Sequence, residues 1–459
     1  MTQDKLRSIP SVDQILGSGF LEREIAALSR PLVAGVVREV LAEVRRAHKK
    51  SSSVPALEAI AAEVCERCRI LERRRITKVI NGTGVLIHTN LGRSPLGREL
   101  LNRAADRISG YSTLEFDLES GKRGRRGSFL AFILAQLTGS DSAIAVNNNA
   151  AALFLILNTF ANKREVVVSR SELVQIGGGF RIPDIIRRAG AKLVEVGTTN
   201  QTTLRDYKEA ISDKTTMLLK VHRSNFHLAG FVDEVSPEKL AELAAKKKLV
   251  SVYDLGSGAF HQTEKFGMEA EPNITAALRS QSSLVCFSAD KLFASTQAGI
   301  VIGKPELTEE LHQNPIYRAL RLDKVTMTLL EESALSYLRK DDAALLPLWR
   351  QIRTTVAELR ERANAINTTL RESGIVAVAA DSVATPGGGS LPGGELPSVA
   401  IVLKPTISAA EFSRKLLDAA TPLIGYLKKD EFYLDLRTVD PAEDAELIRI
   451  LLDNKSCLL

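Results

Sequence analysis

Between residues 76 and 330, short apolar runs alternate with segments of helical periodicity, and this pattern limits the folds open to the chain. Continuous runs rich in Val, Ile and Leu are typical of strands buried on both faces, as in a parallel sheet covered by helices. The pattern therefore predicts an α/β domain with a mostly parallel sheet, in which ligands bind at the carboxyl ends of the strands. The predicted strands are Ala143–Val146, Val166–Ser169, Leu193–Val196, Met217–Val221, Leu249–Tyr253, Leu284–Phe287 and Ile300–Ile302.

The rest of the chain divides around this domain, because 459 residues are too many for one compact domain. We expect a basic helical module in residues 1–70, a large α/β domain in 71–335 and a smaller C-terminal α/β domain in 336–459. The last of these should contain a long helix near Leu346–Glu372. A Gly- and Pro-rich stretch, Thr385–Gly394, is expected to form a flexible loop that is free to reach toward a site.

The N-terminal module carries most of the excess positive charge. Ser11 is expected to cap a short helix, and Pro31 to end or kink the next one. Residues 1–78 hold 15 Lys and Arg against 10 Asp and Glu, which accounts for five of the six net positive charges. A second basic cluster is Lys122–Arg126. Such clusters attract phosphate backbones, and a solvated face that only aids solubility is the alternative.

Composition argues against several classes of protein. The chain is 44% apolar and 25% charged, as in ordinary globular proteins. It has no apolar run long enough to span a membrane, and its first residues lack the apolar segment of a signal peptide, so we expect a cytoplasmic protein without a membrane partner. Cys65 and Cys68 have no second pair to complete a zinc site, so no metal is expected.

Three features that follow predicted strands carry the chemistry. A lysine at the end of a buried strand is expensive to desolvate unless its amine is neutralised or used, and Lys291 is such a residue. Asp254 ends another strand, where it suits a pyridinium N–H. The turn Asn147–Ala152 suits a phosphate at a helix N-terminus, with Asn148, Asn149 and Ala150 as the expected contacts.

Each feature alone has an ordinary explanation: a snorkelling lysine, a capping aspartate or an asparagine in a turn. In combination, and in this order along one parallel sheet, they favour a pyridoxal phosphate (PLP) site of the fold-type I class. Lys291 would then form a Schiff base with the cofactor.

Longer motifs resemble the bacterial selenocysteine synthases, the L-seryl-tRNA(Sec) selenium transferases, over almost the whole chain. The opening Ile9–Asp13 also fits this family. The matching segments are Asn81–Leu96, Tyr111–Asp117, Gly177–Asp184, Val196–Asn200, Arg318–Lys324 and Leu434–Val439.

The resemblance implies a reaction. Serine esterified to tRNA(Sec) displaces Lys291 from PLP, and the freed Lys291 removes the Cα proton while Asp254 stabilises the cofactor ring. Loss of water gives a dehydroalanyl intermediate, and selenium from selenophosphate adds at Cβ. Family arginines near the selenium donor match Arg93, Arg318 and Arg321, although spacing alone favours a salt-bridged helix face for the last two.

The resemblance also implies partners. The basic N-terminal module is similar to the tRNA-binding module of the family, so serine-charged tRNA(Sec) is the expected macromolecular substrate. The family forms ring-shaped homo-oligomers, decamers built from dimers, and we expect the same here.

Several positions depart from the family pattern. Alanine, serine and threonine replace small glycines and a proline around the lysine, and other replacements lie further away. These departures leave PLP chemistry intact and affect the expected pocket. They are Gln175, Gln201, Arg223, Ala289, Ala294–Thr296 and Tyr426.

Two other functions remain open from the sequence. One is a PLP-dependent lyase of the same fold that acts on a small free amino acid or amino sugar acid. Its substrate has a free carboxylate that needs an arginine clamp, and Arg437 is available in the sequence for that role. The other is an RNA-binding protein without catalytic activity, which predicts no bound cofactor. The basic N-terminal module favours the tRNA-dependent transferase over the lyase.

Overall fold

The computed structural model describes residues 9–48 and 55–459, and the chain divides into two compact units, one up to Val79 and one from Ile80 to Leu459. In the first unit, Ser11 caps a short helix with a capping box, as predicted. The helix break near Pro31 lies at Ser29, whose φ is 86°, and the proline occupies the first turn of the next helix. The helices are α2 (Val12–Leu16), α3 (Glu22–Leu28), α4 (Arg30–His48) and α5 (Leu57–Glu72).

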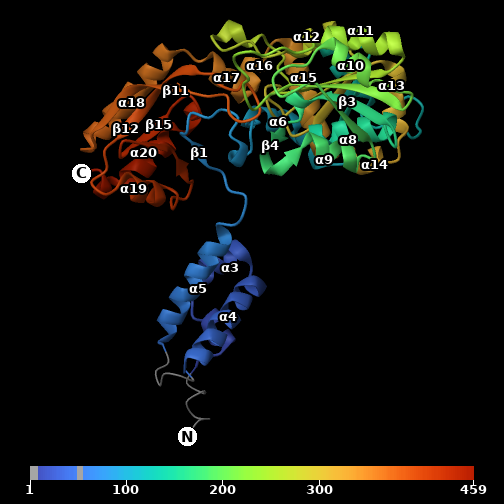
Figure 1. Ribbon diagram of the computed structural model, residues 1–459. Helices are drawn as coiled ribbons and strands as arrows, with labels where there is room; N and C mark the ends of the chain where they lie inside the picture. The colour runs from blue at the N-terminus through green and yellow to red at the C-terminus, as the bar shows by residue number, and fades with distance from the viewer. Residues whose placement is uncertain (1–8, 49–54) are drawn as a thin grey trace. The chain divides into compact units, whose positions relative to one another are not determined.

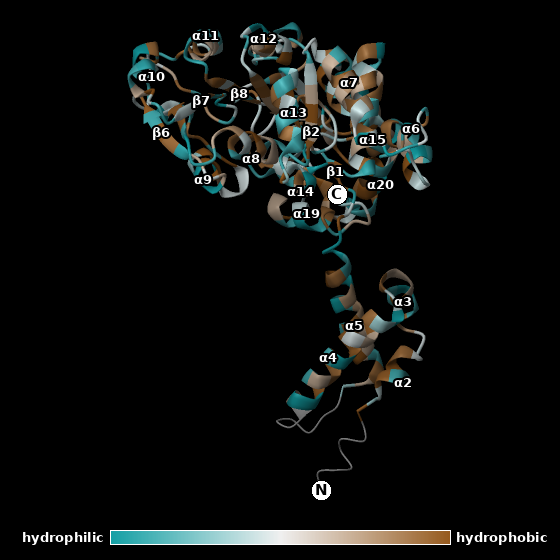
Figure 2. Ribbon diagram, turned by 90° about the vertical axis from the view of Figure 1, so that its right-hand side faces the viewer, coloured by the Kyte–Doolittle hydropathy of each residue, from teal (hydrophilic) through white to brown (hydrophobic). Residues whose placement is uncertain are grey.

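A small apolar core holds these helices together. Ile15, Leu41, Ile60 and Val64 are buried in it, and the buried thiol of Cys68 packs among them. Figure 2 shows that the helices of this unit carry both hydrophilic and hydrophobic residues, as expected for helices with one face in a core.

The second unit contains a seven-stranded sheet in the order β2-β10-β9-β8-β7-β3-β6. All seven predicted strands are present. The sheet is parallel except for β10, which runs antiparallel to both of its neighbours. The strands are β2 (Ser142–Val146), β3 (Glu165–Ser169), β6 (Lys192–Val196), β7 (Thr215–Val221), β8 (Val250–Gly256), β9 (Leu284–Ser288) and β10 (Gly299–Gly303).

Helices cover both faces of this sheet (Figure 1), which explains why the strands are apolar throughout. One face packs against α8 (Asn149–Phe160), α9 (Ile182–Arg188) and α13 (Pro305–Gln313). The other face packs against α7 (Ser128–Thr138), α10 (Leu204–Ala210), α11 (Pro237–Lys247) and α12 (Ile274–Arg279), with α6 (Arg98–Ser109) and α15 (Lys324–Arg339) beyond α7.

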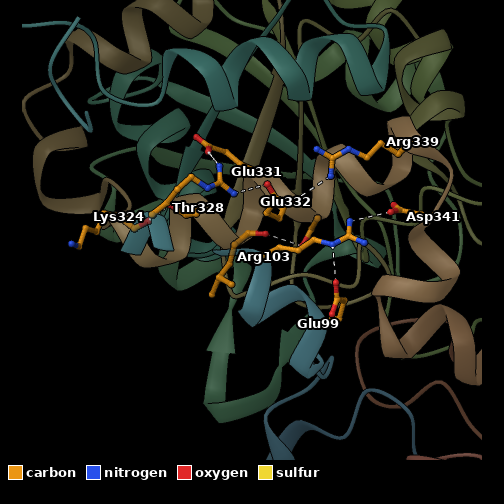
Figure 3. Close-up of polar contacts among 11 residues, drawn as sticks. Glu99, Arg103, Lys324, Thr328, Glu331, Glu332, Arg339 and Asp341 are labelled. Atoms are coloured by element: carbon orange, nitrogen blue, oxygen red, sulfur yellow. Dashed lines mark hydrogen bonds and ion pairs between the residues drawn. The ribbon is translucent and has the colours of Figure 1, made fainter. Parts of the chain in front are cut away.

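Ion pairs fasten α6 to α15, as Figure 3 shows. Arg103 Nη1 lies 3.0 Å from Asp341 Oδ2, just after α15. Arg107 pairs with both Glu331 and Glu332, and the second of these carboxylates is buried. A buried carboxylate needs such a partner, so the network fixes α15 relative to α6.

The C-terminal part of this unit has its own antiparallel sheet, in the order β11-β12-β15-β14. The predicted long helix over 346–372 is wrong as a single element. It is two helices, because Thr355 caps the second with a capping box to Glu358. The elements are α17 (Pro347–Arg353), α18 (Val356–Glu372), β11 (Ala377–Ala384), β12 (Leu396–Leu403), α19 (Ala409–Leu416), β14 (Tyr426–Lys428), β15 (Glu431–Asp435) and α20 (Asp444–Asp453).

The division of this unit at residue 335 stays a prediction, since Ile80–Leu459 forms one compact unit and α15 runs through that position. A short parallel pair, β1 (Ile80–Asn81) with β13 (Leu423–Ile424), links the start of the unit to its C-terminal part. Within the described residues, no helix combines the length and apolar character that crossing a membrane requires.

Candidate active site

Lys291 lies in a tight loop that begins where β9 ends at Ser288. Within this loop the N–H of Ser295 donates to the carbonyl of Ala289, at 2.8 Å. Helix α15 supports the loop from outside, because Tyr337 Oη donates to the Phe293 carbonyl at 2.8 Å. The ion pairs that fix α15 therefore also fix the backbone that carries the lysine.

The Lys291 side chain is buried, with 4% of the residue exposed. Its Nζ donates to the Gly389 carbonyl at 2.9 Å, and no carboxylate of the described residues lies within ion-pair distance of it. Burial, followed by the nearby charge of Arg93, lowers the pKa of Lys291 from its usual 10.5. The amine is thus held closer to its neutral, nucleophilic form than an exposed lysine would be.

The contact with Gly389 confirms that the Gly- and Pro-rich loop reaches the site. Gly389 has φ of 88°, and a Cβ at this position would lie 2.9 Å from Lys291 Nζ. The backbone conformation therefore favours glycine, and a side chain here would also displace the lysine amine.

Asp254 lies in β8, where it is buried beside Cys286 of β9. Its Oδ1 accepts a hydrogen bond of 2.8 Å from Asn149 Nδ2. Burial raises the pKa of Asp254, whereas the Asn149 bond and the charge of Lys291 favour the ionised form. The carboxylate is therefore oriented by an amide from α8 and lies in the electrostatic field of the lysine.

The predicted phosphate turn lies between β2 and α8. Asn148 caps α8, because its side chain accepts from the Ala151 N–H at 2.9 Å. The first helical N–H groups, those of Asn149 and Ala150, point out of the helix and suit a bound anion. The Asn149 side chain donates to Asp254, so the predicted contact of Asn149 with the phosphate would have to come from its backbone N–H. Gly299 of β10 allows this packing, since a Cβ there would lie 2.2 Å from the Asn148 carbonyl oxygen.

These residues fit pyridoxal phosphate. A buried amine without a carboxylate partner suits the aldehyde, a buried carboxylate suits the ring nitrogen, and a helix N-terminus suits the phosphate. Two buried polar atoms at the site, Asn149 Oδ1 and Ser257 Oγ, have no hydrogen-bond partner among the described residues. Such atoms are expected where a polar group binds.

The structure separates the predicted donor arginines. Arg93 Nη1 pairs with Asp290 Oδ2 at 2.8 Å, directly beside Lys291. Arg318 and Arg321 instead line a cavity of 370 Å³ that Arg93 does not line. Asp290 was not predicted as a site residue, although its position next to the lysine was a signal that could have identified it.

Most of the departures from the family pattern have local explanations. Arg223 Nη1 lies 3.0 Å from Glu234 Oε2, Gln175 accepts from Arg181, and Tyr426 stacks on Tyr433. Gln201 closes a turn in which its N–H donates to Thr198 Oγ1.

Among the residues near the lysine, Ala294 has φ of 57°, a conformation that strongly favours glycine. The glycine expected from the family pattern therefore suits the backbone better than the alanine found here.

Arg437 is not placed as a substrate clamp. It is buried, and its Nη1 donates to the carbonyls of Gln351 and Thr354 at 2.7 and 2.8 Å, while its Nη2 donates to the Pro397 carbonyl. These bonds hold α17 against β12 and commit both terminal nitrogens of the guanidinium to backbone oxygens. Arg437 was the residue that supported the alternative function, a small-molecule lyase, and its role in the structure is to stabilise the fold.

Comparison with known proteins agrees with this geometry. A sequence model of the family described as L-seryl-tRNA selenium transferase matches residues 79–440, and one described as selenocysteine synthase N terminal matches residues 6–45. The L-seryl-tRNA(Sec) selenium transferase of Nautilia profundicola is 40% identical over 447 residues, 97% of each chain. Those of Campylobacter concisus and Aquifex aeolicus are 41% and 40% identical, covering 97% and 95% of this chain and 98% and 95% of theirs.

Among solved structures, D-glucosaminate-6-phosphate ammonia-lyase superposes with a TM-score of 0.58 at 20% identity, covering 85% of this chain and 98% of the other. This likeness shows the fold, which is the predicted fold-type I architecture of PLP-dependent enzymes. The sequence matches extend over nearly the whole chain and are far closer. The chain belongs to the L-seryl-tRNA selenium transferase family.

Proposed function

We propose that the chain converts L-seryl-tRNA(Sec) to selenocysteinyl-tRNA(Sec), by loss of water from the seryl group and addition of selenium at Cβ, with pyridoxal phosphate as cofactor. The observation that carries this proposal is the buried Lys291, which has no carboxylate partner and lies in the field of Asp254. It belongs to a chain that is 40% identical, over 97% of its length, to a named L-seryl-tRNA(Sec) selenium transferase.

Bound at this site, pyridoxal phosphate supplies an electron sink for the Cα–H bond of the seryl group. Asp254, oriented by the hydrogen bond from Asn149, would hold a proton at the ring nitrogen of the bound cofactor. Lys291, whose pKa is lowered by burial, accepts the Cα proton in its neutral form. The loop around Gly389 covers the lysine and limits the access of water.

The proposed selenium donor is selenophosphate. Arg318 and Arg321 line a cavity together with Arg125 and Arg126, and guanidinium groups bind phosphate oxygens in pairs. Arg93 does not line this cavity, and it pairs with Asp290 beside Lys291, so its proposed contact with the donor is at the lysine rather than in the cavity.

The proposed macromolecular partner is tRNA(Sec), bound through the N-terminal unit. Exposed arginines on α4 and just after α5 supply the positive charge that a phosphate backbone requires: Arg38, Arg45, Arg46, Arg74 and Arg75. Because tRNA is charged in the cytoplasm, the proposed location of the enzyme is the cytoplasm.

The proposed assembly is a homo-oligomer, a decamer built from dimers. Support comes from apolar side chains that are exposed on and near α7. Phe129 and Phe132 are 50% and 60% exposed, and Leu118 is 77% exposed. A group of such residues is typical of a surface that a partner covers. Native mass spectrometry measures the size of the assembly, and a monomer would contradict the proposal.

The central test uses purified protein with seryl-tRNA(Sec) and selenophosphate, followed by identification of the released amino acid by mass spectrometry. We expect selenocysteine from the wild type and unchanged serine from Lys291→Ala. A wild-type protein that leaves the seryl ester unchanged would contradict the function. Filter binding with tRNA(Sec), and with a serine tRNA as control, tests the partner separately.

A further inference from the structure

The cavity that holds Arg318 and Arg321 joins two distant parts of the chain. One part is the basic cluster after Tyr111–Asp117, and the other is the segment around α14 (Tyr317–Leu320). The charged residues of its lining are five arginines and one glutamate, so positive charge is in large excess. They are Glu115, Arg123, Arg125, Arg126, Arg318 and Arg321.

Glu115 is shared among the arginines of this cavity. Its carboxylate lies 2.6 Å from Arg123 Nη2, 3.0 Å from Arg126 Nε and 3.1 Å from Arg321 Nη1. Its side chain is only 24% exposed, and its backbone is fixed because its carbonyl accepts from the Gly124 N–H at 3.0 Å. Arg123 above all, then Arg126 and Arg321, lower the pKa of Glu115, so it is a carboxylate at neutral pH.

The remaining lining arginines are not neutralised by Glu115. Arg318 is exposed and forms no ion pair with any residue that the structure describes, and Arg125 turns to Glu309, 2.7 Å away, which does not line the cavity. The cavity thus presents a free guanidinium beside guanidiniums that are already bound to a carboxylate. This is the arrangement of an anion site that is partly occupied by a side chain of the same protein.

We propose that Glu115 is an internal competitor in the oxyanion site formed by Arg126, Arg318 and Arg321, and that a phosphate-class dianion displaces its carboxylate from Arg321. This inference rests on the proposed function, because it takes the same arginines as the donor site. A dianion with several oxygens binds a guanidinium pair more strongly than a single carboxylate does. Glu115 therefore weakens the binding of every anion, and only an anion that binds the arginines strongly enough displaces it. It acts on specificity rather than as a catalytic residue.

The test measures binding of inorganic phosphate to the full-length, PLP-loaded protein by isothermal titration calorimetry at low ionic strength, without tRNA. Glu115→Gln keeps the shape of the side chain and removes one negative charge a few ångströms from the anion. Its dissociation constant for phosphate should fall by about tenfold. Glu310→Gln removes the same charge from an exposed residue of α13 that neither lines the cavity nor pairs with its arginines, and it should change the constant by less than about threefold.

An unchanged or weaker affinity in Glu115→Gln would overturn the proposal, because it would mean that the carboxylate only braces the arginines. An equally large gain in Glu310→Gln would also overturn it, since the effect would then be one of net charge. In Glu115→Gln combined with Arg321→Gln the gain should disappear, and a gain that persists contradicts the assigned place of the anion. Cofactor absorbance and thermal unfolding confirm that each variant is folded.

Phosphate binding requires neither tRNA nor selenium transfer. A protein that fails to make selenocysteinyl-tRNA but shows the Glu115 effect would contradict the function and support the anion site. A protein with normal selenium transfer and no effect of Glu115→Gln on phosphate binding would support the function and contradict the anion site.

Discussion

Two buried lysines at the carboxyl edge of the same sheet have opposite surroundings. Lys220, in β7, is 7% exposed at its side chain, and its Nζ lies 2.7 Å from Glu172 and 3.0 Å from Glu234. Lys291, after β9, is equally buried and has only the Gly389 carbonyl as a partner. One amine is neutralised by carboxylates, and the other is not.

The difference separates a structural lysine from a chemical one. A buried ion pair satisfies both charges, so Lys220 and Glu172 hold β7 to the segment after β3. A buried amine without such a partner carries a desolvation penalty that favours its neutral form, and the neutral form is the nucleophile. Burial alone would have selected both lysines, and only the absence of a carboxylate at Lys291 distinguishes the reactive one.

The largest expected effect is that of Lys291→Ala on activity. Selenium transfer should fall by a factor of about a thousand or more, because the residue that bonds the cofactor and moves the Cα proton is removed. The absorption band of the bound cofactor should disappear, while the unfolding temperature of the cofactor-free protein should not fall, since a costly buried amine is lost. Retention of the band would contradict the assignment of Lys291.

The corresponding substitution of the other lysine, Lys220→Met, should lower the stability of the protein rather than its activity. Removal of one partner leaves Glu172 buried and unpaired, and this should reduce the free energy of unfolding by about 3–5 kcal/mol in a denaturant titration. Activity per folded molecule should remain close to that of the wild type.

Addition of Glu172→Gln to Lys220→Met tests the cause of that loss. The second substitution removes the unpaired charge, so part of the lost stability should return. A double variant as unstable as the single one, or a single variant with no activity when folded, would break the distinction between the two lysines.

Asn149→Ala tests the other half of the Lys291 site. Loss of the hydrogen bond to the buried Asp254 carboxylate should weaken cofactor binding by about tenfold or more, because hydrogen bonds to charged groups contribute about 1.5–3 kcal/mol. Equilibrium titration of the cofactor-free protein with pyridoxal phosphate measures this change, and the bound cofactor should still absorb. An unchanged affinity would mean that Asp254 does not depend on α8 for its orientation.

Features that lie within one helix or strand could be predicted from the sequence. Apolar runs of three to five residues predicted all seven strands, and the polar residues that follow them predicted Lys291 and Asp254. The antiparallel direction of β10 could not be read from its composition, because a buried strand is apolar in either direction.

Features that depend on pairing across the fold could not be predicted. Asn149 meets Asp254 over 105 positions, and Arg321 meets Glu115 over 206, so neither partner is visible from local spacing. The break before α18 was local and was missed, although Thr355 and Glu358 form a recognisable capping box. The commitment of Arg437 to backbone carbonyls required the folded C-terminal part.

The smallest expected effect is a shift in the pH dependence of cofactor uptake, which reports the pKa of Lys291. Protonated Lys291 cannot attack the cofactor aldehyde, so the rate of cofactor uptake by the cofactor-free protein should rise with pH, with a midpoint below 10.5, the usual lysine value. In Arg93→Met the repulsion from the guanidinium is lost and Asp290 loses its partner. Both changes raise the pKa of Lys291.

The midpoint of uptake in Arg93→Met should therefore move to higher pH. Stability follows the same sign. Between the lowered pKa and 10.5 the unfolded chain binds more protons than the folded one, so the stability of the cofactor-free protein rises with pH, over a narrower window in the variant. Arg98→Met, at the exposed start of α6, is the control and should leave the midpoint in place. An unmoved midpoint in Arg93→Met would show that desolvation alone sets the Lys291 amine apart from Lys220.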